Sequence, residues 1–254
     1  MQCGTMRVYV AIAYLDRQDW AGGTVWSSAV GGFELCLRGF FERDTDGMIA
    51  AHVSLYFEDT TEETRRQLTP FVPPNADLND GFFIDVLADG HHRVSLASDP
   101  LSWYRKWDRV RVELYAVAPT TRRRVLDIER VFQRMLGYVK TQPPYDCYQN
   151  CNSVCLWPAR CSPTLGICCP CSSGTNCIES VAVSLASGFG ASEWDAESAL
   201  GIKRRVARGA RLPSTFRDEL IRAGVIEGPP HVLFMARVVS VGVTTPLLPA
   251  VLIR

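Results

Sequence analysis

Histidine is scarce in this sequence, and neither sign of charge is in excess. Only four of the 254 residues are histidines, and 27 Lys and Arg balance 27 Asp and Glu. A chain without net positive charge lacks the usual footprint of a polyanion binder, so specific nucleic-acid binding is not expected. Because imidazole is the commonest general base near neutral pH, the four histidines also leave few candidates for acid–base catalysis.

Long apolar runs are missing as well. The longest apolar stretches are interrupted by charge or glycine, so no transmembrane segment is expected. The first twenty residues alternate like a strand and lack a basic start, which argues against a secretory signal. The expected location is therefore cytoplasmic, where thiols and metal thiolates are favoured over disulfides.

The distribution of apolar residues predicts strands first and helices later, which is an α+β layout in one domain spanning 1–254. Strands are expected at 6–15, 31–41, 48–58, 81–98 (with a turn at Asp89-Gly90), 109–118 and from His231 onward. Helices are expected near 61–68, 99–107, 121–140 (capped by Thr120 or Thr121, with Val125 on its apolar face), 177–190 and 214–224.

One cysteine stands at the start of a predicted helix. In "GTNCIESVAVSLASGFG" (174–190), Cys177 follows a polar lead-in and opens an amphipathic segment. A helix N-terminus offers N–H groups and a positive partial charge, which stabilise a thiolate. Cys177 is therefore a candidate nucleophile.

A thiol nucleophile needs an imidazole and a group that orients it. His52 is the one histidine inside an apolar strand, in "AAHVSLYF", whereas His91 and His92 sit beside a predicted turn and His231 follows Pro-Pro. Asp85 lies in the apolar run "FFIDV", where a buried carboxylate is costly without a partner. His52 would be that partner. The alternatives are a histidine satisfied in the core and an edge-strand carboxylate facing water.

The order of these elements resembles the circularly permuted NlpC-type papain-like hydrolases. In that family a histidine strand, a second strand with an acidic or polar residue, a long helix and a Tyr-Asp pair precede the cysteine helix. Here "AHVSLYFE", "FFIDV", the helix near 121–140, "PPYD" and "TNCIES" follow in that order. The resemblance covers about residues 30–190.

The resemblance implies a permuted papain-like fold, with an antiparallel sheet packed on the nucleophile helix and a C-terminal extension over 191–254. It implies that Cys177 is the nucleophile, His52 the general base and Asp85 the orienting residue. Tyr145 of the Tyr-Asp pair would line the cleft or donate to the oxyanion, or else be a packed aromatic. The implied activity is hydrolysis of a peptide or isopeptide bond in a peptide or protein substrate, with no cofactor for catalysis.

Three alternatives stay open. Cys151 in "NCN" resembles the nucleophile of the PPPDE-type isopeptidases, although no long amphipathic helix follows it. The second alternative is an inactive papain-like scaffold whose cysteine loop binds a metal or a protein partner. A lipid acyltransferase or amidase is the third; an acyltransferase would be expected to carry a membrane-anchoring tail, and "TTPLLPAVLIR" is too short and Pro-broken for one.

The segment 147–171 departs from these relatives, which have a shorter connection, and favours a viral source. Eight of the ten cysteines lie between Cys147 and Cys177, in spacings that match no common zinc motif. Bound zinc, disulfides and free thiols all remain possible, and a structural zinc is preferred because no secretory signal is present. Its ligands would be a subset of the following seven, with Cys177 excluded: Cys147, Cys151, Cys155, Cys161, Cys168, Cys169 and Cys171.

Overall fold

Six antiparallel strands form one sheet, in the spatial order β4-β3-β2-β1-β5-β8. The computed structural model describes residues 6–16, 48–87, 92–97, 109–122, 124–144, 175–192, 195–209 and 213–237. The strands are β1 Arg7–Asp16, β2 Ile49–Glu58, β3 Phe82–Asp85, β4 Arg93–Leu96, β5 Arg109–Ala116 and β8 His231–Arg237, with a separate two-residue pair, β6 Thr120–Thr121 and β7 Arg124–Val125. The helices are α2 Glu62–Leu68, the 3₁₀ turn η2 Thr69–Phe71, α3 Ile128–Thr141, α5 Cys177–Gly188, α6 Ala196–Leu200, α7 Arg204–Ala207 and α8 Pro213–Arg222.

Alternation along the strands divides the apolar residues between the two faces of the sheet. One face joins the helices in the main core, to which β1, β2 and β3 contribute Val8, Val10, Ile12, Val53, Leu55, Phe57, Phe82 and Ile84. The other face carries a second buried cluster of Tyr9, Ala11, Ala13, Tyr56, Phe83, Val110, Val112 and Leu114. The sheet is therefore buried on both faces.

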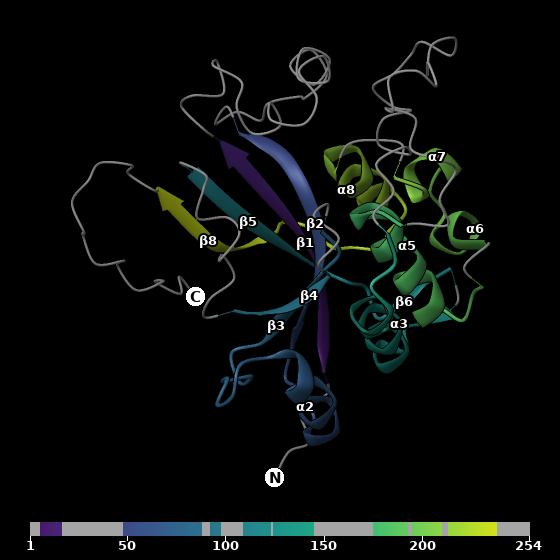
Figure 1. Ribbon diagram of the computed structural model, residues 1–254. Helices are drawn as coiled ribbons and strands as arrows, with labels where there is room; N and C mark the ends of the chain where they lie inside the picture. The colour runs from purple at the N-terminus through teal and green to yellow at the C-terminus, as the bar shows by residue number, and fades with distance from the viewer. Residues whose placement is uncertain are drawn as a thin grey trace, which may run out of the picture.

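Helices α3 and α5 to α8 gather on the face of the main core (Figure 1). In α5 every residue except Ser187 is buried, as expected of a helix at the centre of a fold. The start of α3 meets the end of α5, where the Asp127 N–H donates to the Gly188 carbonyl at 2.9 Å. A Cβ at Gly188 would lie 2.3 Å from Cγ2 of Val131, so glycine allows this close approach.

The α+β prediction with an antiparallel sheet is confirmed, and the strands expected at 6–15, 48–58 and 109–118 are present. The helix expected over 121–140 begins later, at Ile128, because Asp127 caps it by accepting the Arg130 N–H at 3.0 Å. The preceding residues form the β6–β7 pair instead, and Val125 is 75% exposed rather than in the core. The capping role expected of Thr120 or Thr121 is therefore wrong.

The sheet reaches beyond the range 30–190, because β1 lies at its centre and β8 at its edge beside β5. The strand expected at 31–41, the helix expected at 99–107 and the turn at Asp89-Gly90 fall outside the described residues. Within the described ranges, no helix has both the length and the apolar character needed to cross a membrane.

Candidate catalytic site

His52 lies on β2 next to an irregularity in the strand pairing. Ala13 of β1 pairs with His52 and Tyr14 pairs with Ala50, so Ala51 is an inserted residue between the two pairs. A bulge of this kind bends the strand and re-aims the neighbouring side chain. His52 is only 5% exposed, so its ring needs polar partners within the protein.

The first partner of His52 is Asp85, and the side chains of His52, Asp85 and Ser95 are hydrogen-bonded in turn across strands β2, β3 and β4. Leu55 of β2 pairs with Ile84 of β3, which brings Asp85 opposite Ser54 and diagonal to His52. The distance between His52 Nε2 and Asp85 Oδ1 is 3.0 Å. On the next strand, Ser95 Oγ donates to Asp85 Oδ2 at 3.1 Å. Both carboxylate oxygens of Asp85 are thus engaged, and the buried carboxylate is fixed in orientation.

Cys177 is the first residue of α5, and Asn176 caps this helix. Asn176 Oδ1 accepts the N–H groups of Ile178 at 3.1 Å and of Glu179 at 2.9 Å. This is an N-cap bond pattern, which satisfies first-turn donors that have no acceptor within the helix. Cys177 is present as a buried thiol, 5% exposed, at the positive end of the helix dipole.

His52 joins Cys177 to Asp85. Burial alone lowers the pKa of the His52 imidazole, but hydrogen bonds to Asp85 and Cys177 and the negative charge of both raise the pKa to about 9. Because Nε2 faces Asp85, the other ring nitrogen, Nδ1, is the one available to Cys177. The raised pKa of His52 favours an imidazolium between two acceptors, so a thiolate–imidazolium pair is the state that this arrangement favours.

Replacing Asp85 tests this arrangement directly. We expect Asp85→Ala to lower the pKa of His52 by about one to two units, because the carboxylate that stabilises the imidazolium is lost. Asp85→Asn should lower this pKa less, since an amide oxygen still accepts from Nε2. Ser95→Ala, which removes one bond to Asp85, should have the smallest effect. NMR titration of the four histidine rings, with His52→Gln to assign the signal, gives the values. An unchanged His52 midpoint in Asp85→Ala would remove Asp85 from the site.

Asn176, the cap of α5, is contacted by Arg208 and Gly209, the two residues that follow α7. Asn176 Nδ2 donates to the Arg208 carbonyl at 3.2 Å. Gly209 has φ +70°, and a Cβ there would lie 2.1 Å from Asn176 Oδ1. A side chain at position 209 would therefore push against the atom that caps α5.

Gly209→Ala should consequently destabilise the protein more than Gly224→Ala. Both glycines have positive φ, but a Cβ at Gly224 would meet no atom within 4 Å. The backbone cost of about 1–2 kcal/mol applies to both variants, whereas Gly209→Ala adds an overlap of about 1–3 kcal/mol. Urea unfolding measures the difference in free energy of unfolding. Equal losses in the two variants would mean that the cap tolerates displacement.

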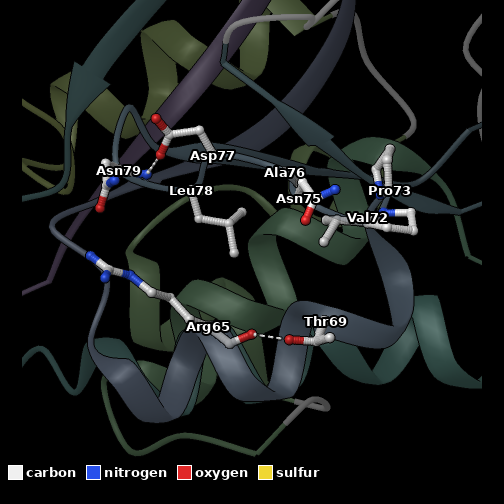
Figure 2. A pocket seen from close by; sticks show the side chains of 10 residues that line it. Arg65, Thr69, Val72, Pro73, Asn75, Ala76, Asp77, Leu78 and Asn79 are labelled. Carbon is white, nitrogen blue, oxygen red and sulfur yellow. Dashed lines mark hydrogen bonds between the residues drawn. The ribbon is translucent and has the colours of Figure 1, made fainter.

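A surface hollow of about 420 Å³ lies elsewhere, between α2, η2 and the loop that leads to β3 (Figure 2). Arg65, Val72, Asn75 and Asp77 are among its lining residues. The hollow lies beyond the end of β2, which is at Glu58, six residues after His52. At the rise of a strand, these six residues separate the hollow from His52 by about 20 Å. This hollow therefore does not belong to the Cys177 site.

The structure brings together Cys177, His52 and Asp85, while the other predicted site residues lie outside the described ranges. These are Tyr145 and the seven cysteines proposed as zinc ligands, the rival nucleophile Cys151 among them. The Thr175 N–H donates to the Pro144 carbonyl at 3.1 Å, so the connection that carries these cysteines starts and ends beside α5. In the described part of the chain, no group of three or more His, Cys, Asp and Glu is placed to hold a metal ion. The zinc site stays a prediction.

Sequence reasoning missed several residues around the site. The Asn176-x-x-Glu179 spacing is close to a capping box and was a usable signal for the exact start of α5. Ser95 and Arg208 gave no such signal, because each contacts the site across a strand or helix pairing. In the basic stretch 202–211, Lys203, Arg204 and Arg205 are exposed, whereas the Arg208 side chain is 26% exposed and reaches α5.

Comparisons with known proteins add no relative. No protein-family model matches the chain, and neither a curated protein nor a solved structure matches it. The chemistry of this site therefore has to be argued from its own residues.

Proposed function

We propose that the protein is a cysteine-dependent hydrolase of the permuted papain-like kind, which cleaves a peptide or isopeptide bond in a peptide or protein substrate. The observation that carries this proposal is the hydrogen-bonded chain from Cys177 through His52 to Asp85. All three groups are buried, and the imidazole of His52 and the carboxylate of Asp85 would be costly to retain there without partners. The order histidine strand, acidic strand, cysteine helix also supports it.

The first half of the reaction forms an acyl-enzyme. The Cys177 thiolate attacks the carbonyl carbon of the scissile amide, and negative charge moves to the carbonyl oxygen. The Cys177 N–H, in the first turn of α5, would donate to that oxygen. As the C–N bond breaks, the His52 imidazolium gives its proton to the departing amine, and a thioester on Cys177 remains.

The second half hydrolyses the thioester. Neutral His52 removes a proton from water, and the resulting hydroxide attacks the thioester carbonyl. The C–S bond breaks, releasing the carboxylic acid product and restoring the thiolate beside an imidazolium. Asp85 stays ionised throughout and holds the ring in position, while Ser95 holds Asp85. Because the thiolate must remain reduced, an intracellular location is part of the same proposal.

Labelling with electrophilic probes of three classes tests the proposal. Peptide, ubiquitin-like and phospholipid probes are each incubated with the intact protein, and the modified residue is identified by mass spectrometry. We expect modification of Cys177 by a peptide or ubiquitin-like probe, and its suppression in His52→Ala. Cys177→Ser is the matched control for labelling at the other cysteines. Labelling only by the phospholipid probe would indicate a lipid acyltransferase, and no labelling of Cys177 would indicate an inactive scaffold.

A further inference from the structure

The first turn of the nucleophile helix carries a buried acidic residue two positions after Cys177. The Glu179 side chain is only 8% exposed. Arg208 Nη1 donates to Glu179 Oε1 at 2.7 Å, and the Arg208 side chain is itself 26% exposed. A buried carboxylate in this position needs such a partner, since an uncompensated charge is strongly unfavourable inside a protein.

The same arginine contacts this turn at a second point. Its carbonyl accepts from Asn176 Nδ2, and the next residue, Gly209, lies directly against Asn176 Oδ1. Arg208 thus reaches α5 through its side chain and through its backbone, at residues on either side of Cys177. One residue after α7 therefore contributes both to the charge and to the placement of the nucleophile turn.

We propose that Arg208 is a positioning residue for Cys177, which neutralises the Glu179 carboxylate so that it does not oppose the thiolate. The inference rests on the proposed function, because it assigns Arg208 a role in that same site. A carboxylate in the first turn repels a thiolate in that turn, and a guanidinium bound to it cancels most of this repulsion. Arg208 also anchors the cap that orients the first-turn N–H groups.

Other charged groups act on Cys177 from the elements packed around it, and the experiment has to hold them constant. His52 of β2 interacts with Cys177 directly and is bonded to Asp85 of β3, while the further charged residues on the neighbouring elements are Arg93 of β4 (the register partner of Asp85), Glu179 of α5 itself, and the exposed Lys140 near the end of α3.

The test is the pH dependence of Cys177 alkylation by iodoacetamide, followed on the Cys177 peptide of the full chain. We expect Arg208→Met to raise the pH midpoint by about one unit, which slows alkylation about tenfold at a pH below the midpoint. Glu179→Gln should lower the midpoint, because Arg208 then acts on the thiolate without compensation. The double variant should return the midpoint towards that of the wild type. A purely structural role would not produce opposite shifts in the two single variants.

Arg66→Met is the matched control, since Arg66 pairs with Glu63 on α2, far from the site. It should leave the midpoint unchanged. If Arg208→Met does not fold, the inference is still tested by the lowered pH midpoint expected in Glu179→Gln and by the midpoint of the double variant. A reactive Cys177 with the same midpoint in all Arg208 and Glu179 variants overturns this inference alone. A wild-type Cys177 that reacts only above about pH 8, like an ordinary thiol, overturns the proposed function instead.

Discussion

His52→Ala should slow the alkylation of Cys177 at pH 6 by roughly 100-fold. In the proposed site, an imidazolium at His52 stabilises the thiolate at this pH, because the pKa of the ring is raised to about 9. Without the ring, the thiolate fraction follows an ordinary thiol pKa of about 8.5, lowered somewhat by the helix N-terminus. Iodoacetamide reacts with the thiolate, so its rate at the Cys177 peptide measures that fraction.

The difference in alkylation rate between the wild type and His52→Ala should shrink as the pH rises, since the Cys177 thiol of the variant is ionised near pH 10 even without the His52 ring. His231→Ala is the matched control, because His231 is an exposed histidine on β8. It should leave the rate at Cys177 unchanged at every pH. Equal rates at pH 6 in the wild type and His52→Ala would show that the ring does not activate the thiol.

The largest loss of stability is expected from Phe132→Ala in α3. Phe132 is fully buried, and its ring meets Phe57 of β2 and Phe82 of β3 edge-on, at centroid distances of 5.8 and 6.0 Å. Phe57 and Phe82 stack on each other at 5.2 Å. Removing the ring creates a cavity between α3 and the two strands that carry His52 and Asp85. We expect the free energy of unfolding to fall by about 3–5 kcal/mol.

Urea unfolding followed by circular dichroism measures this loss. Phe132→Leu should cost less, because it fills much of the same volume. Val125→Ala, at a residue that is 75% exposed, should change the free energy of unfolding by less than about 0.5 kcal/mol. A loss below about 1 kcal/mol in Phe132→Ala would mean that the neighbouring side chains collapse into the space.

The elements that local pattern determines were predictable from the sequence. Alternation identified β1, β2 and β5, and the polar lead-in before Cys177 identified the start of α5. The three central site residues could be proposed because each is unusual in its local setting: a histidine and an aspartate in apolar strands, and a cysteine at a helix start. A residue that is unusual for its local segment can be recognised from a single sequence.

What the sequence did not reveal depends on pairing between distant segments. Nothing in the pattern of β8 indicates that it lies beside β5, and nothing around Ser95 indicates that it donates to Asp85. The start of α3 was misplaced because apolar spacing continued through Val125, while the cap at Asp127 decided the boundary. Nothing in the sequence around Arg208 indicates that it contacts the first turn of α5.

The order of these segments along the chain has a consequence for synthesis. His52 and Asp85 are translated before Cys177, and the Arg208-Gly209 turn that contacts the cap of α5 is translated after it. Domains fold as the chain emerges, so His52 and Asp85 can pair before α5 is present. When Cys177 is translated, Asn176 still lacks its hydrogen bond to the Arg208 carbonyl. Under the proposed function, Cys177 is therefore an ordinary thiol in the nascent chain and becomes an activated thiol only when the fold is complete.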